Sequence, residues 1–196
     1  MSQPAPLPTY YPSAVRLQLP FFTVSWSFHT SRAKMASGVK VADKVVDFFK
    51  DMKIAKNEEG RVRVATFDFI EDFIDVGGTT TQAELDAKQM DGFEFFKSLL
   101  SPDKCRYILY DCHFATKESS TKEELVFVMW CSETSKPKDK MNYAASKENL
   151  IKKLPGIKHN FQFNDLADCP DRNVFAGKLG KTVTSLEGVP VFYDAA

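Results

Sequence analysis

Three kinds of residue could do chemistry in this sequence, but none has the spacing of a catalytic or metal site. Cys112-His113 offers a thiol and an imidazole, yet neighbours on a strand point to opposite faces and cannot bond as nucleophile and base. Gly77-Gly78-Thr79-Thr80 lacks the lysine and the spacing of a phosphate-binding loop. The carboxylates of Glu71, Asp72 and Asp86 show no metal-ligand pattern. The sequence therefore predicts a protein that is not an enzyme, with no metal and no cofactor.

The composition is that of an ordinary globular protein without a strong charge bias. The chain has 196 residues, 43% of them hydrophobic, and 17 phenylalanines that can build a core. Its 26 Lys and Arg residues equal its 26 Asp and Glu residues, so no global basic field predicts nucleic-acid binding. The cysteines form no C-x-x-C pair and follow no convincing secretory signal, so reduced thiols in a cytosolic protein are predicted for Cys105, Cys112, Cys131 and Cys169.

Residues 1–34 differ in composition from the rest of the chain. They contain Arg16, Arg32 and Lys34, several prolines and no acidic residue. We predict a disordered extension over 1–34, followed by a single domain over 35–196. Two alternatives stay open: an organelle transit peptide, or sequence upstream of a true start at Met35.

Interleaved helix and strand patterns predict an α/β fold with a central sheet between helices. Apolar residues at helical spacing predict helices over 41–52, 92–100, 138–154 and 171–179, the last closed by Gly180. Alternating or continuous apolar runs predict strands over 61–69, 73–76, 106–114, 125–131 and 161–163. Gly77-Gly78 is expected to end the second strand, and residues 116–124 to form a polar turn between the third and the fourth.

The long predicted helix has two distinct faces. One is apolar and should pack on the sheet; it carries Tyr143, Leu150, Ile151 and Leu154. The nearly opposite face carries Lys138, Met141, Ala145 and Lys152. A methionine held in water between lysines indicates a partner-binding face, although a single exposed apolar side chain can also be an ordinary surface residue. Lys147 falls inside the apolar sector, so its stem is expected to reach out toward water.

A collinear set of short motifs runs from Met35 to about Val191. It comprises Met35-Ala36-Ser37-Gly38-Val39, Asp51-Met52-Lys53, Cys105-Arg106-Tyr107, Leu109-Tyr110-Asp111, Thr116-Lys117-Glu118-Ser119, Leu125-Val126-Phe127, Lys140-Met141, Tyr143-Ala144, Gly156-Ile157-Lys158-His159 and Ser185-Leu186-Glu187-Gly188. In this order and near this spacing, the set resembles the cofilin and actin-depolymerising factor (ADF) family. The resemblance implies one ADF homology domain of gelsolin-like type: a mixed sheet of five or six strands flanked by helices.

The same resemblance implies a function and the residues that perform it. Such a protein binds actin monomers and filaments, and severs and depolymerises the filaments. The implied monomer-binding residues are Ser37, Gly38, Val39, Lys138, Lys140, Met141 and Lys152. The implied filament-binding residues are Lys122, Glu123, Glu124, Asp171, Arg172 and Lys178. The alternatives are solvated charged surface at these positions, and a module that binds actin or phosphoinositides without severing.

Regulation is also implied by the resemblance. Ser37 matches the family's phosphoserine, the target of a LIM-type kinase and its opposing phosphatase, and phosphorylation there would switch actin binding off. His159 matches a position linked to pH sensitivity, although a structural histidine fits equally well. Phosphoinositide lipids would bind Lys152, Lys153 and Lys158.

The expected protein is a cytoplasmic monomer of the actin cytoskeleton. Residues 56–61 lack the lysine-rich run that serves nuclear import in vertebrate members, so import by that route is not expected. Residues 189–196 outrun the family's usual short ending.

Overall fold

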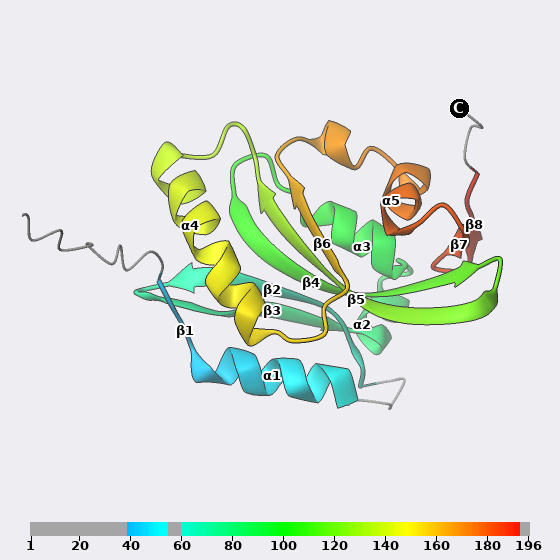
Figure 1. The fold of residues 1–196 in the computed structure, drawn as a ribbon, viewed down its shortest axis with the longest axis horizontal. Helices are drawn as coiled ribbons and strands as arrows, with labels where there is room; N and C mark the ends of the chain where they lie inside the picture. The colour runs from blue at the N-terminus through cyan, green and yellow to red at the C-terminus, as the bar shows by residue number, and fades with distance from the viewer. Residues whose placement is uncertain (1–38, 55–59, 193–196) are drawn as a thin grey trace, which may run out of the picture. The chain divides into compact units, whose positions relative to one another are not determined.

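The computed structural model describes residues 39–54 and 60–192 of the chain (Figure 1). Six strands form the main path of one sheet, in the spatial order β1-β3-β2-β4-β5-β6. Beyond the part of β4 that pairs with β2, the same edge of β4 pairs with β7, which in turn pairs with β8. The strands are β1 (Lys40–Val41), β2 (Val62–Ile70), β3 (Phe73–Thr81), β4 (Cys105–Thr116), β5 (Ser119–Cys131), β6 (His159–Phe163), β7 (Val183–Leu186) and β8 (Val189–Pro190). Only β1 with β3 and β5 with β6 pair in parallel among these strands, so the predicted mixed sheet is confirmed.

The helices form where their apolar stripes and end signals predict, with small shifts of their ends. They are α1 (Asp43–Ile54), α3 (Gly92–Ser98), α4 (Pro137–Lys153) and α5 (Arg172–Leu179), with α2 (Gln82–Ala87) and the 3-10 turn η1 (Leu166–Asp168) added. The helix α2 was not predicted, although Thr81 and Glu84 have the spacing of a capping box and form one at its start. Across the described ranges, no helix is long and apolar enough to cross a membrane.

Two apolar layers cover the two faces of the sheet. Alternate residues of β4 and β5 point to opposite faces, as the period of a strand requires. One layer packs α1 and α4 on the face that contains Tyr107, Leu109 and Phe127. The other packs α3 and α5 on the face that contains Tyr110 and Val128. The sheet therefore separates the surface of α4 from the surface of α5.

Two predicted strand ends were wrong. Gly77-Gly78 does not end β3, which continues to Thr81 through an irregularity in its pairing with β2. Glycine is needed there because a Cβ on Gly77 would lie 2.1 Å from Oδ2 of Asp68. The polar turn predicted over 116–124 is also much shorter, because residues from Ser119 onward pair across the hairpin with β4.

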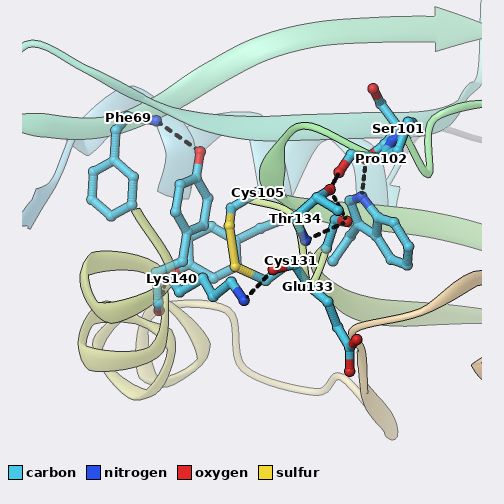
Figure 2. The surroundings of a disulfide bond; sticks show 12 residues. Phe69, Ser101, Pro102, Cys105, Cys131, Glu133, Thr134 and Lys140 are labelled. Carbon is cyan, nitrogen blue, oxygen red and sulfur yellow. Dashed lines mark hydrogen bonds between the residues drawn. A yellow bond between two sulfur atoms is a disulfide. The ribbon is translucent and has the colours of Figure 1, made fainter. Parts of the chain in front are cut away.

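The prediction that all four cysteines are reduced was wrong for one pair. Cys105 and Cys131 form a disulfide, because the antiparallel register of β4 and β5 places them directly opposite each other with their Cα atoms 4.1 Å apart. Figure 2 shows this bond beside the loop that leads from β5 into α4. Cys112 and Cys169 are free and buried, as structural cysteines would be. Burial raises the pKa of the Cys112 thiol well above its usual range and that of Cys169 to about 11.

A buried ion pair fixes the hairpin of β7 and β8 to the main sheet. Glu187 and Gly188 have positive φ angles of 51° and 76°, which a tight two-residue turn requires. The Glu187 carboxylate accepts two 2.7 Å bonds from the Arg63 guanidinium of β2, and the Tyr110 hydroxyl donates to it as well. Both ion-pair side chains are less than 7% exposed, with Arg63 at 4% and Glu187 at 6%. Removing either partner would leave the other charge buried without compensation.

The disulfide makes a direct prediction for stability. Its two cysteines are 26 residues apart, and closing a loop of this length restricts the unfolded chain. Reduction should lower the free energy of unfolding by about 3 kcal/mol, measured by urea unfolding with and without a phosphine reductant. The double variant Cys105→Ala/Cys131→Ala serves as the control and should not respond to the reductant. Equal stability of the wild-type chain in both conditions would contradict a formed bond.

Candidate functional site

The orientation of α4 is fixed by Tyr143, which is 6% exposed. Its ring lies 4.4 Å from the Phe69 ring, and the Tyr107 hydroxyl donates a 2.5 Å bond to its backbone carbonyl. The Tyr143 hydroxyl accepts from the Phe69 N–H, an atom beyond the point where β2 stops pairing with β4 (Figure 2). Burial, with the Asp68 carboxylate nearby, raises the pKa of the tyrosine. These contacts fix the rotation of α4 about its own axis, and so determine which of its side chains face the sheet.

The opposite side of α4 presents the predicted methionine to solvent. Met141 is 67% exposed, and Lys138, Ala145 and Lys152 are exposed with it. Neither Lys138 nor Lys152 forms an ion pair with any residue of 39–54 or 60–192. This face can therefore offer a soft apolar group and two unpaired ammonium groups to a partner.

Two lysines of α4 differ from those on the open face. The Lys140 ammonium donates a 2.6 Å bond to the Glu133 carbonyl, in the loop before the helix, so Lys140 holds the helix start in place (Figure 2). Lys147 is half-buried as expected from its place in the apolar sector, and burial lowers its pKa.

Val39, the first described residue, lies beside α4. Two adjoining hollows of about 570 and 560 Å³ lie between β1 and α4, and Val39 lines both. Their other walls include Phe73, Lys152 and Lys153, together with Ser146, whose buried hydroxyl has no hydrogen-bond partner among the described residues. The predicted site residues Ser37 and Gly38 lie outside the described residues.

The residues predicted to contact filaments lie on both faces of the sheet. Lys122 and Glu124 lie on the same face of β5 as Val126 and Val128, the face that α5 covers. Glu123 lies on the α1 and α4 side and bonds to Arg61 at 2.6 Å. Arg61 also binds the buried Asp111 carboxylate at 2.5 Å. Burial would raise the pKa of Asp111, but bonds from His113 and Arg61 hold it below its usual range.

Three further predicted contact residues belong to α5, and two of them stabilise the fold. Asp171 is the N-cap of α5 and accepts a bond from the Val174 N–H. Arg172 pairs with Asp91 at 2.6 Å, donates to the Leu186 carbonyl and lies over the Phe93 ring. Lys178 is exposed, with its ammonium 5.6 Å from the centre of the Phe163 ring. Arg172 is thus committed to internal contacts.

His159 lies in a small ionic cluster rather than alone at the surface. Its Nε2 is 2.9 Å from one oxygen of Glu124, and the Lys158 ammonium is 2.5 Å from the other. Burial would raise the pKa of Glu124, but the bonds from Lys158 and His159 lower it below its usual value. Of the three predicted lipid-binding lysines, Lys158 is therefore already paired, while Lys152 and Lys153 stay exposed at the end of α4.

Sequence reasoning missed the residues that hold these surfaces in place. Arg61, Arg63 and Glu187 were assigned no role from the sequence, because their ion pairs join residues 50 or more positions apart. The only early signal for Glu187 was its place before Gly188, which marks a tight turn but not a buried carboxylate.

Comparison with known proteins identifies the domain that carries these surfaces. A family model described as cofilin/tropomyosin-type actin-binding protein matches residues 38–179. The chain belongs to the cofilin/ADF family. It is accordingly an actin-binding domain with the ADF homology fold, and not an enzyme. The match starts one residue before Val39 and ends at Leu179, the last residue of α5.

Solved structures agree with this assignment. The Plasmodium berghei actin depolymerization factor 2 is 29% identical, with a TM-score of 0.58, covering 68% of this chain and 92% of that one. The Streptomyces griseoflavus cofilin is 27% identical, with a TM-score of 0.55 and coverage of 67% and 91%. The Entamoeba histolytica coactosin, at 20% identity and a TM-score of 0.58, covers 73% and 95% and shares the fold.

The cluster around Glu124 makes stability depend on pH. Because its pKa is lowered in the folded protein, its contribution is present above the ordinary value of 4.5 and is lost as the pH falls through the lower folded value. Glu124→Gln should lower the free energy of unfolding by about 1 kcal/mol at pH 7 and flatten its fall at acid pH. Urea unfolding between pH 7 and pH 3 measures this, with Glu118→Gln as an exposed control. If the free energy of unfolding fell with pH in the same way for wild type and Glu124→Gln, the proposed contribution of the cluster to stability would be contradicted.

Proposed function

We propose that this actin-binding domain severs and depolymerises actin filaments in the cytoplasm. The observation that carries the proposal is the open face of α4, where Met141 is 67% exposed between two unpaired lysines. Exposing a large thioether costs solvation free energy that burial at a partner would recover, about 1.5–3 kcal/mol. The Met141 side chain would enter an apolar cleft of an actin monomer, while Lys138 and Lys152 meet acidic residues around it.

Severing requires a second contact, because a protein that binds one subunit through one face cannot strain the junction between two. Lys122 supports such a contact: it lies on the α5-facing side of the sheet and forms no ion pair in the part of the chain described. Arg172 does not support it equally well, since its guanidinium already binds Asp91 and Leu186. A domain that lacked the second contact would sequester or stabilise actin without severing.

The function is tested with the full chain by monomer binding, filament co-sedimentation and severing microscopy. Met141→Ala should weaken both monomer and filament binding about tenfold, because it removes the apolar anchor. Lys122→Ala should reduce severing and leave monomer binding unchanged. Leu166→Ala, which truncates a side chain 47% exposed on η1, is the matched control. A wild-type chain that binds filaments without shortening them would contradict severing.

We further propose that phosphorylation of Ser37 by a LIM-type kinase switches actin binding off, and that a phosphatase restores it. Ser37 precedes Val39 by two residues, and Val39 lines the hollows beside α4 together with Lys152. A phosphate carries about −1.5 to −2 charges at neutral pH. It would neutralise the lysines that attract actin and repel the acidic residues of the partner.

Two smaller regulatory proposals concern exposed lysines and the Glu124 cluster. Lys152 and Lys153 remain available for phosphoinositide headgroups, which would compete with actin for the end of α4. His159, 2.9 Å from Glu124, is placed to couple filament binding to pH through its charge.

The phosphorylation switch predicts that Ser37→Glu weakens monomer binding about tenfold or more, while Ser37→Ala binds like wild type. Fluorescence titration of labelled actin monomers measures both. Raising the salt concentration should narrow the difference, because the effect is electrostatic. If Ser37→Glu and Ser37→Ala bound equally well at low salt, the switch would be wrong.

A further inference from the structure

The disulfide between Cys105 and Cys131 is placed in a domain whose proposed location, the cytoplasm, does not favour disulfides. Glutathione keeps most thiols of that compartment reduced, and the disulfides that do form there commonly take part in redox chemistry. Such a bond is expected to exchange with small thiols if one of its sulfur atoms can be reached. Both cysteines are buried, at 8% exposed for Cys105 and 3% for Cys131, so the question is which of them borders an open space.

A hollow of about 300 Å³ borders one end of the disulfide, between the first turns of α4 and the edge strand β6. Cys131 lines this hollow and Cys105 does not. The volume is at the lower end of the range for pockets that hold small molecules. The Cys131 sulfur is therefore the one that a small thiol can approach.

The other walls of the hollow suit a small anionic peptide. Lys140 lines it from α4, and its ammonium group bonds only a neutral partner, the Glu133 carbonyl at 2.6 Å, so its charge is not cancelled there. The exposed Glu133 carboxylate, and the amide side chains of Gln162 and Asn164, belong to the same walls. Figure 2 shows Lys140 and Glu133 beside the disulfide.

Glutathione has the complementary groups. It carries carboxylates at both ends, an ammonium group beside one of them, and peptide groups between. Lys140 can meet a carboxylate, Glu133 the ammonium group, and the two amide side chains the peptide groups. A nearby cation also favours the thiolate, which is the form of a thiol that attacks a disulfide.

We propose that Cys131 is a thiol-exchange site for a small anionic thiol of the glutathione type. The incoming thiolate attacks Sγ of Cys131 and a new S–S bond forms there, while the bond between the two cysteines breaks. Sγ of Cys105 leaves as a thiolate and takes up the proton that the incoming thiol lost. The exchange consumes one thiol and one disulfide and yields one of each, so it requires no oxidant.

The exchange would act on the start of α4. This helix begins without a side-chain N-cap bond, and residues 132–136 connect it directly to Cys131. A peptide in the hollow would draw Lys140 from the Glu133 carbonyl at the same time as the disulfide opens. The turn that carries Lys138 and Met141 would lose both restraints, although Tyr143 still holds the helix further along. We expect weaker monomer binding, and this effect rests on the proposed function of α4.

The site is tested by comparing Cys105→Ala with Cys131→Ala in the full chain. Both variants lose the same disulfide, so each is matched in stability to the other. With oxidised glutathione, Cys131 in the first variant should form a mixed disulfide about tenfold faster than Cys105 in the second, because only Cys131 borders the hollow. Peptide mapping by mass spectrometry measures both rates, and the buried free thiols of Cys112 and Cys169 should stay unmodified.

The charge of the hollow is tested in the otherwise wild-type chain with reduced glutathione and with 2-mercaptoethanol, which is uncharged. Lys140→Gln should slow the exchange with glutathione about tenfold and affect the neutral thiol much less. Lys136→Gln is the matched control, because Lys136 is exposed just before α4 and does not line the hollow. An equal effect of Lys140→Gln on both thiols would overturn the charged site.

The remaining outcomes separate the parts of the proposal. Equal rates at the two cysteines would overturn the assignment to Cys131, and equal modification of Cys112 and Cys169 would show reaction through the unfolded chain. If Cys105→Ala fails to fold, brief treatment of the wild-type chain followed by alkylation decides: glutathione on Cys131 supports the site, and glutathione on Cys105 overturns it.

The effect on actin is measured with the glutathione-loaded wild-type chain. Its affinity for monomers should fall about fivefold, and thiol reduction should not restore the unmodified affinity in full, because the disulfide stays open. An unchanged affinity would overturn the effect on α4 and leave the exchange site standing. Failure of the unmodified chain to bind monomers would instead overturn the proposed function and leave the chemistry of Cys131 untouched.

Discussion

The packing of Tyr143 on the sheet is the contact on which the binding surface depends. Its ring meets Phe69, its carbonyl accepts from Tyr107, and its hydroxyl satisfies an N–H that β4 no longer reaches. A helix that is fixed at one residue to this extent cannot rotate, so the residues on its far side are determined as well. Met141, two residues before Tyr143, is therefore held in solvent although it is apolar. The packing of α4 on the sheet does not use the side chains of its solvent-facing side, so those side chains are free to bind a partner.

The charged side chains described above fall into two groups: those that form internal ion pairs and those that remain unpaired. Arg63 with Glu187, Arg172 with Asp91, and Glu124 with Lys158 and His159 join segments far apart in the sequence. A charge in such a pair already has its counterion, so it has little left to offer a partner. Lys138, Lys152 and Lys122 have none among the residues that the structure describes; the first two are exposed on α4, and Lys122 is half-buried on the β4–β5 hairpin. Whether a charged residue has an internal ion-pair partner therefore distinguishes binding residues from structural ones better than its residue type does.

The sequence predicted the parts of the fold that depend on local patterns. The helices around Phe49, Phe96 and Leu150 and the exposure of Met141 follow from apolar periodicity. The disulfide, the bulge at Gly77 and the burial of Glu187 do not, because each depends on a register or a partner distant along the chain. Arg172 shows the same limit within the site. A charged residue at the start of a surface helix is expected to be free to bind a partner. Only the fold shows that the Arg172 guanidinium is paired with Asp91 and lies over the Phe93 ring.

The central claim, that the face of α4 fixed by Tyr143 is covered by actin, can be tested by oxidation of methionine side chains. Met141 is 67% exposed and should oxidise quickly in the free protein, whereas Met52 at 5% and Met129 at 2% should oxidise slowly. Mass spectrometry of the chain exposed to peroxide, alone and with saturating actin monomers, reads each site. The account predicts that actin slows the oxidation of Met141 strongly and leaves Met52 and Met129 unchanged. An unchanged rate at Met141 in the bound state would contradict it.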